Sequence, residues 1–218
     1  VQAVHQAAPR DRPEPDPDLM IYSGGFLSDA DRRTLEGLRR LAPEALAQAR
    51  PRFADPRLPE SDDFRRTDAY IRAIVAVGSQ IVFRLGESIE HTKRKYHVHP
   101  PADAGKWAAV CVGIVRHYND GWAEGFRHRI RYWEIWNEPE NRPAMWTGTD
   151  ADYFRLYSAA SKAIKGRFPD VCVGGPAVGY LGQMQGENLE PGAFVKAFLE
   201  HCRRDGAPLD FFSWHTYT

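Results

Sequence analysis

The sequence has few cysteines and no net charge. The first feature argues against a disulfide-rich or zinc-binding protein, and the second against a nucleic-acid-binding one. Its 218 residues contain only three cysteines, Cys111, Cys172 and Cys202, which are widely spaced in apolar surroundings. Buried free thiols are therefore favoured over a disulfide framework or a zinc site. Lys and Arg total 29, as do Asp and Glu, so no excess of basic residues indicates nucleic-acid binding.

Long apolar runs are also missing. No segment approaches the ~20 apolar residues that a transmembrane helix needs. The first residues, Val1 to His5, contain neither an initiator methionine nor the apolar region of a signal peptide. We therefore expect no membrane partner, a slight preference for a cytoplasmic location, and a chain that is a cut piece of a longer protein. The oligomeric state stays open.

The content of hydrophobic residues, 43%, is enough to bury a substantial core. Residues 1–18 are polar and rich in proline, so we expect an extended or disordered N-terminal segment before a single domain over 19–218. Within the first part of that domain the pattern predicts a short strand at 19–22. It then predicts a helix from an N-cap at Ser28 to about Arg50.

From Phe53 onward, predicted strands and helices alternate. Apolar runs predict strands at 80–85, 130–136, 170–174 and 209–215. Helices are expected after the N-caps Thr67 and Thr149 and over 107–118 and 194–199, with a loop rich in Gly and Gln before Pro191. The short connections favour a parallel sheet with right-handed crossovers. A doubly wound open sheet fits the same alternation, but no glycine-rich phosphate loop follows an early strand.

The strand predicted at 130–136 ends in Asn137, Glu138 and Pro139. Proline removes a donor from the strand ladder, so regular pairing should stop there. An amide and a carboxylic acid are thereby presented side by side at the C-terminal end of a strand. In a barrel of alternating strands and helices, catalytic groups lie at this end.

The segment Trp136-Asn137-Glu138-Pro139 resembles the acid/base signature of the clan A retaining glycosidases. Together with residues 145–149 (Met-Trp-Thr-Gly-Thr) and 173–176 (Val-Gly-Gly-Pro), it is similar to glycoside hydrolase family 39, from about Phe53 to the last residue. The resemblance implies an α/β fold, a (β/α)8 TIM barrel that is incomplete and ends after about the sixth strand. Two strands should precede Phe53 in that family, and only 19–22 is a candidate.

The resemblance also implies the roles of the motif residues. Glu138 is the candidate general acid/base, which protonates the leaving oxygen and then activates water. Asn137 would bind the 2-hydroxyl of the sugar. His215 and Tyr217, one residue apart, should point the same way, and in similar enzymes such a pair orients the nucleophile and touches the sugar. The alternatives are a loop cap and turn for Glu138 and Asn137, and a core histidine with a terminal tyrosine.

No nucleophile can be assigned from the sequence. In the clan it lies at the end of the seventh strand, beyond these residues. Glu134 should lie too deep inside the barrel, and Glu187 and Glu190 follow the wrong strand. We therefore expect the 218 residues alone to be inactive and, as an open arc of sheet, poorly stable.

Other residues have a functional and a structural interpretation. Arg84 could contact substrate or form an ion pair with Glu134, and Trp146 could stack on a sugar or cover the next helix. Glu87 and Glu90 could contact sugar. His91, His97 and His99 could suggest a metal, but Lys93, Arg94 and Lys95 repel cations, so we expect neither metal nor cofactor. His117 should interact with a helix C-terminus.

These observations predict a retaining glycoside hydrolase that hydrolyses O-glycosyl bonds, similar to β-xylosidases or iduronidases, with a carbohydrate as its partner. The alternative is a carbohydrate-binding barrel without hydrolysis, or an inactive fragment.

Overall fold

The computed structural model describes residues 56–59, 64–86 and 98–216. These residues form two compact units, one of 81–86, 98–112 and 130–216, the other of 56–59, 64–80 and 113–129. The predictions for 1–18, 19–22 and 28–50, and those for Glu87, Glu90, His91, His97 and Tyr217, fall outside the described residues.

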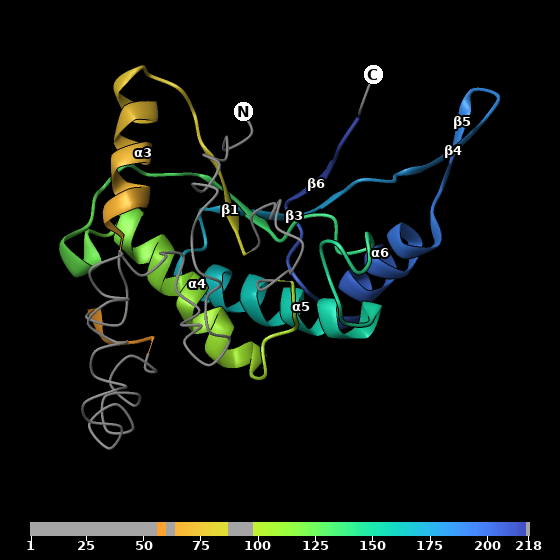
Figure 1. Cartoon of the computed structure of the whole chain (residues 1–218), viewed down its shortest axis with the longest axis horizontal. Helices are drawn as coiled ribbons and strands as arrows, with labels where there is room; N and C mark the ends of the chain where they lie inside the picture. The colour runs from red at the N-terminus through yellow and green to blue at the C-terminus, as the bar shows by residue number, and fades with distance from the viewer. Residues whose placement is uncertain (1–55, 60–63, 87–97, 217–218) are drawn as a thin grey trace, which may run out of the picture. The chain divides into compact units, whose positions relative to one another are not determined.

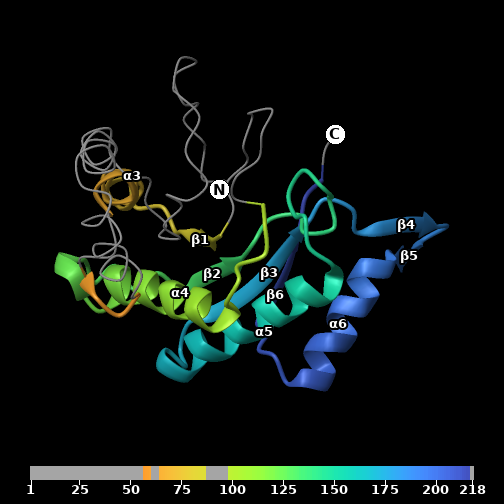
Figure 2. The same ribbon diagram turned by 60° about the horizontal axis from the view of Figure 1, so that its bottom comes forward.

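The first unit is built on a four-stranded sheet (Figures 1 and 2). Its strands are β1 (Val82–Leu85), β2 (Tyr132–Ile135), β3 (Cys172–Val178) and β6 (Phe211–Trp214), in the order β1-β2-β3-β6. Each neighbouring pair is parallel. The four predicted strands and their parallel pairing are therefore confirmed.

Helices form the crossovers between these strands. They are α4 (Ala104–Asn119), whose first half belongs to this unit, α5 (Asp150–Arg167) and α6 (Ala193–Asp205). Figure 2 shows α5 and α6 on the same face of the sheet. On that face the hydroxyl of Tyr153 in α5 donates to the carbonyl oxygen of Ile135 at 3.0 Å. Arg84 and Glu134 are register partners on the parallel strands β1 and β2, so their side chains lie on one common face of the sheet.

The core between helices and sheet is largely aromatic. Trp133, Trp136, Trp146, Tyr153, Tyr157 and Phe198 are all completely or almost completely buried. The Trp136 ring stands edge-on to Trp146, with centroids 4.9 Å apart, and tilted against Trp107. Two of these indoles keep a hydrogen bond: Trp136 Nε1 donates to the Met145 carbonyl, and Trp146 Nε1 donates to the Thr149 carbonyl. This core fixes the segment that follows β2.

The predicted N-cap of α5 is confirmed. Thr149 Oγ1 accepts from the backbone N–H of Asp152, whose carboxylate accepts from the backbone N–H of Thr149. This reciprocal capping box satisfies two N–H groups that a helix start leaves unpaired.

The predicted loop between β3 and α6 is partly wrong. It contains an antiparallel hairpin of β4 (Gly182–Gln185) and β5 (Asn188–Pro191). Its large apolar side chains, Met184 and Leu189, are both exposed. A strand that buries no face has no alternating apolar pattern in its sequence, which is why the pattern did not reveal it.

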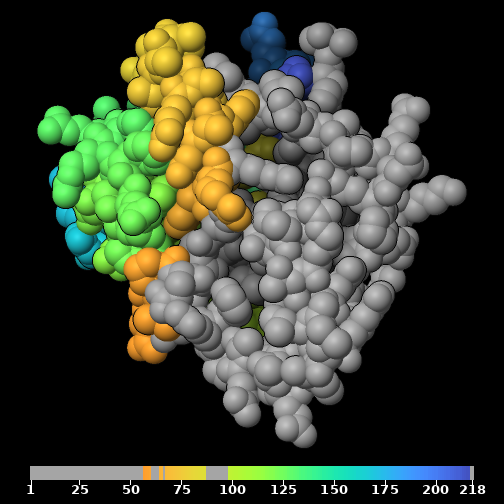
Figure 3. All heavy atoms as spheres, turned by 60° about the vertical axis from the view of Figure 1, so that its left-hand side comes forward, coloured from red at the N-terminus to blue at the C-terminus, as the bar shows by residue number. Residues whose placement is uncertain are grey.

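The second unit pairs α3 (Arg65–Ala76) with the second half of α4 and the short 3₁₀ helix η3 (Trp122–Glu124). Figure 3 shows α3 in orange and yellow beside residues 113–129 in green. The predicted cap at Thr67 is wrong, since the helix begins at Arg65 and its N-cap is Phe64, three residues before Thr67. His117 is buried, its Nε2 2.9 Å from Asp68 Oδ1 and its Nδ1 3.0 Å from the Trp122 carbonyl oxygen, contacts more specific than the expected helix-end interaction.

The three cysteines are free, and Cys111 and Cys202 are buried. Burial raises the pKa of the Cys111 thiol well above its ordinary value and raises that of Cys202 to about 12. Both are therefore protonated core thiols, as predicted, whereas Cys172 is only partly buried. Among the described helices, none is both long and apolar enough to cross a bilayer.

Candidate active site

The turn after β2 is held in an unusual backbone conformation. Trp136 and Glu138 have φ angles of 70° and 46°, in the left-handed region that non-glycine residues seldom adopt. The backbone N–H of Trp136 donates to the Leu85 carbonyl at 2.8 Å, and that of Glu138 to the Ala177 carbonyl at 3.2 Å. A non-glycine residue in the left-handed region lowers the stability of the fold by of order 1–3 kcal/mol, which the surrounding packing must offset. The turn thereby directs the Glu138 side chain from the end of β2 toward the ends of β3 and β6.

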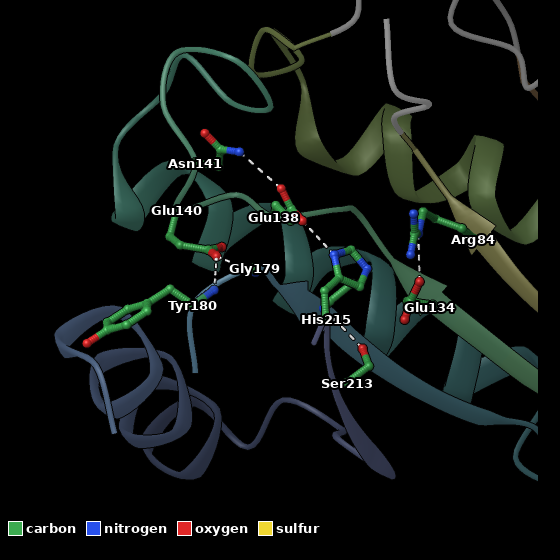
Figure 4. Close-up of polar contacts among 10 residues, drawn as sticks. Arg84, Glu134, Glu138, Glu140, Asn141, Gly179, Tyr180, Ser213 and His215 are labelled. Atoms are coloured by element: carbon green, nitrogen blue, oxygen red, sulfur yellow. Dashed lines mark hydrogen bonds and ion pairs between the residues drawn. The ribbon is translucent and has the colours of Figure 1, made fainter. Parts of the chain in front are cut away.

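Both oxygens of the Glu138 carboxyl have a side-chain partner (Figure 4). His215 Nδ1 lies 2.5 Å from Oε1, and Asn141 Nδ2 donates to Oε2 at 3.0 Å. Gly179 closes a third side, because a Cβ added there would lie 3.0 Å from both Cδ and Oε1 of Glu138. The side chain of Glu138 is only 8% exposed. The carboxyl is thus held in one orientation beside a group that can exchange a proton with it.

His215 reaches this position because β6 is anchored to β3. The backbone N–H of His215 donates to the Val178 carbonyl at 2.8 Å, and Ser213 Oγ accepts from the backbone N–H of Ala177 at 3.0 Å. The prediction had His215 near the nucleophile and the sugar, and the structure brings it to Glu138. Its contact with the sugar stays a prediction, as does the role of Tyr217.

Asn137 is completely buried, and neither its Oδ1 nor its Nδ2 has a hydrogen-bond partner among the described residues. A buried amide without partners costs about 1–3 kcal/mol. Such a group in a native protein calls for an explanation. A ligand hydroxyl, which can donate and accept at once, would satisfy it.

A second acidic residue, Glu140, lies on the same loop. Its Oε1 accepts from the backbone N–H groups of Gly179 at 2.6 Å and Tyr180 at 3.1 Å. Its Oε2 is buried without a partner in the described part of the chain. Burial raises the pKa of Glu140, the nearby Glu138 charge raises it further, and the backbone hydrogen bonds oppose both effects.

The remaining predicted site residues have structural contacts. Arg84 Nε lies 2.6 Å from Glu134 Oε2, so the ion-pair interpretation of Arg84 is realised, and a substrate contact stays a prediction. Trp146 is fully buried against Trp136 and Tyr153, which favours the packing interpretation over a sugar-stacking face. His99 Nδ1 lies 2.8 Å from Thr147 Oγ1. No group of three or more metal-ligating side chains occurs within the described residues.

The sequence did not single out Asn141, Glu140 or Gly179 as part of the site. Asn141 and Glu140 follow directly after the Asn-Glu-Pro motif, so their position was the available signal. The contact of Gly179 with Glu138 joins segments 41 residues apart, which no local pattern encodes.

A carboxyl at the C-terminal end of a strand, next to an unsatisfied amide and against a histidine from another strand, invites comparison with known proteins. The sequence model of the family described as Glycosyl hydrolases family 39 matches residues 63–218. This chain belongs to glycoside hydrolase family 39. The match covers every residue of the site described above.

Curated relatives agree with this membership. The chain is 28% identical over 167 residues to a protein named Beta-xylosidase from Caldicellulosiruptor saccharolyticus, covering 72% of this chain and 31% of the relative. It is 34% identical over 127 residues to a Beta-xylosidase from Geobacillus stearothermophilus, covering 57% of this chain and 23% of the relative. The chain therefore spans less than a third of the length of these two relatives.

Solved structures of similar proteins share the fold over part of this chain. A glucosidase from Croceicoccus marinus superposes with a TM-score of 0.64 at 32% identity, covering 74% of this chain and 31% of that one. A monomeric beta-xylosidase from Caulobacter crescentus CB15 gives 0.55 at 27% identity, covering 71% and 30%. A second family model, described as Exonuclease I C-terminal domain, matches residues 15–61, most of which lie outside the described residues.

Proposed function

We propose that the complete product of the gene encoding this chain is a retaining glycoside hydrolase with Glu138 as its general acid/base. The observation that carries the proposal is the arrangement at the end of β2. There a single carboxyl is held by His215 and Asn141, immediately after a buried amide whose two polar atoms lack partners among the described residues.

Each of these groups has a task in the proposed reaction. The protonated Glu138 gives its proton to the glycosidic oxygen as the bond to the anomeric carbon breaks, and a second carboxylate attacks that carbon. Glu138, now ionised, takes a proton from the water that releases the sugar. His215 orients the carboxyl throughout, and Asn137 binds the 2-hydroxyl, a contact that strengthens as positive charge develops on the sugar ring.

The second carboxylate is proposed to lie outside this chain. We infer that β1, β2, β3 and β6 form an arc of a (β/α)8 barrel within a domain of 19–218, and that a further strand carries the nucleophile. Glu134 is a poor candidate because its carboxylate is buried and occupied by Arg84. A retaining mechanism needs the two carboxyl groups about 5–5.5 Å apart, and this distance is a test that a longer chain must meet.

The substrate class follows from the relatives. Both curated relatives are named beta-xylosidases and one structural neighbour is named a glucosidase. We propose a β-xyloside as the first substrate to try and a β-glucoside as the second. Iduronides stay a prediction from the family resemblance.

The experiment uses the complete gene product and aryl β-glycosides. The unaltered protein should release the aryl alcohol with the sugar product first formed as the β-anomer, which proton NMR detects. Glu138→Ala should lose most of this activity, and azide should restore release of an activated aryl alcohol while forming a β-glycosyl azide. Azide replaces the base-activated water in the second step, so the sugar ends on nitrogen and no proton transfer is needed.

Two results would contradict the proposal. An unchanged rate in Glu138→Ala would remove the assigned acid/base. Sugar binding by calorimetry without turnover of any activated glycoside would favour the alternative, a carbohydrate-binding barrel that does not hydrolyse.

A further inference from the structure

Glu140 is tied to a different strand from the one that presents it. It belongs to the loop after β2, yet its Oε1 accepts two backbone N–H groups, from Gly179 at 2.6 Å and from Tyr180 at 3.1 Å, in the segment after β3. Figure 4 shows both contacts converging on one carboxylate oxygen, with the Tyr180 ring directed away from Glu138. The side chain therefore acts on the backbone of that segment, and the tyrosine ring takes no part.

The segment that Glu140 holds is the one that touches the catalytic carboxyl. The Gly179 Cα faces Glu138 so closely that an added Cβ would lie 3.0 Å from Cδ. Another tie, from the Glu138 N–H to the Ala177 carbonyl at 3.2 Å, joins the same two segments. If the two Glu140 hydrogen bonds were lost, the hydrogen bond from the Glu138 N–H to the Ala177 carbonyl would remain. The Gly179–Tyr180 segment could then move away from the Glu138 carboxyl.

Holding a carboxylate in this place is unfavourable by itself. Glu140 Oε2 is buried and has no hydrogen-bond partner among the described residues, and burial raises the pKa of the group. Burying an incompletely hydrogen-bonded charge opposes folding. A group kept against such a penalty is expected to serve a purpose other than stability.

We propose that Glu140 is a positioning residue for Glu138: its carboxylate holds the Gly179–Tyr180 backbone against the Glu138 carboxyl and so fixes the direction from which the proton is delivered. The proposal rests on the acid/base role of Glu138. A negative charge on Glu140 also favours the protonated form of a neighbouring carboxyl, because like charges disfavour joint ionisation. His215, whose Nδ1 lies 2.5 Å from Glu138 Oε1, is another titratable group in contact with this carboxyl.

The leaving group of the substrate separates positioning of the acid from general damage. A 2,4-dinitrophenyl glycoside departs without a proton, whereas a methyl glycoside needs one. In the complete gene product, Glu140→Ala should lower kcat/KM for the methyl glycoside by about tenfold or more, because positioned proton transfer contributes about 10²–10⁴-fold. It should change the value for the dinitrophenyl glycoside by no more than about twofold. A merely structural loss would lower both values equally.

The variant Glu140→Gln separates the effect of the two hydrogen bonds from the effect of the negative charge. The glutamine carbonyl oxygen can accept the same two N–H groups, so the preference between leaving groups should return to that of the unaltered protein. The charge is gone, so the alkaline limb of the kcat/KM profile should move to lower pH by about 0.5 unit. Glu187→Ala, which removes an exposed carboxylate from the turn between β4 and β5, is the control and should change neither readout.

A readout that needs no turnover completes the test. Amide hydrogen exchange, followed by mass spectrometry, should be slow at Gly179 and Tyr180 in the unaltered protein and in Glu140→Gln, and faster in Glu140→Ala. The proposal is overturned if Glu140→Ala slows both leaving groups alike, or if exchange at the two amides does not change. If the unaltered protein hydrolyses no glycoside, the proposed function fails and the positioning role fails with it. Loss of activity in Glu138→Ala together with normal leaving-group selectivity in Glu140→Ala refutes the positioning role alone.

Discussion

The closeness of Gly179 to the Glu138 carboxyl makes Gly179→Ala a direct test of the site geometry. The new methyl would lie 3.0 Å from Cδ and Oε1 and 3.3 Å from Oε2 of Glu138. Non-bonded carbon atoms prefer separations of about 3.5–4.0 Å, so the carboxyl or the segment after β3 must move by about 0.5–1 Å. The carboxyl cannot move freely, because His215 and Asn141 hold its two oxygens.

The expected loss follows from that displacement. A misplacement of about 1 Å can cost about 10²-fold in rate. Because the displacement here is about half of that or more, we expect kcat/KM for a methyl glycoside to fall about 10- to 100-fold. Stability should change little, within about 1 kcal/mol, because the φ of Gly179 lies outside the left-handed range and alanine reduces the entropy of the unfolded chain.

The assay is steady-state hydrolysis by the complete gene product, with urea unfolding measured on the same samples. Gly166→Ala serves as the matched control, because its added Cβ meets open space near the end of α5. It should keep full activity. A Gly179→Ala protein that cleaves methyl glycosides at the unaltered rate would refute the close packing of Gly179 against the acid. If Gly179→Ala keeps the unaltered rate while its free energy of unfolding falls, the contact matters only for stability.

Three further predictions concern stability. Arg84→Met should lower the free energy of unfolding by about 2 kcal/mol, because it leaves the buried Glu134 carboxylate without its partner, and a second change, Glu134→Leu, should recover most of this loss in urea titrations. Thr149→Ala should cost about 1 kcal/mol by removing the α5 cap while Thr149→Ser should not, as thermal unfolding can test. Because burial raises the pKa of Glu140, stability from this group is fully present below its ordinary pKa of about 4.3 and is lost as pH rises through the folded pKa. Glu140→Gln should therefore gain stability relative to the unaltered protein between pH 4 and 7, and a constant difference across that range would contradict the shift.

The strands of the sheet were predictable because their burial leaves a mark on the sequence. Apolar runs at 80–85 and 130–136 correspond to β1 and β2, and the Thr149 signal located the start of α5 correctly. The β4–β5 hairpin left no such mark, because its side chains are exposed and its pairing comes from the backbone. The start of α3 was displaced by three residues, because Phe64, which makes no side-chain cap hydrogen bond, is the N-cap in place of the expected Thr67.

The site was predictable in its central residue and less so in its surroundings. The place of Glu138 just after a strand could be predicted because the Asn-Glu-Pro motif follows an apolar run, and its catalytic role stays a prediction. Asn141 contacts Glu138, and Glu140 contacts the backbone of Gly179, because of the conformation of the loop after β2. Gly179 lies against Glu138 because the end of β3 approaches that loop. No spacing in the sequence encodes these distances. The ion pair of Arg84 with Glu134 could be predicted in part. An arginine in an apolar strand requires a partner, and the register of β1 and β2 places Glu134 beside it.

The strained residues of the site and its unsatisfied polar groups lie in one loop. Trp136 and Glu138 have left-handed backbones, Asn137 lacks hydrogen-bond partners in the described region, and Glu140 holds one unsatisfied oxygen. All of them lie between β2 and α5, and groups that restrain them come from the ends of β1, β3 and β6. Under the proposed function, β2 together with the ends of β1, β3 and β6 therefore supplies the proton-transferring half of the site. The nucleophilic half is proposed to come from another strand, so a nucleophile variant of the complete protein should still hold Gly179 and His215 against Glu138. Amide exchange at Gly179 that stays slow in such a variant would support independent assembly of the two halves, and fast exchange would mean that each half needs the other.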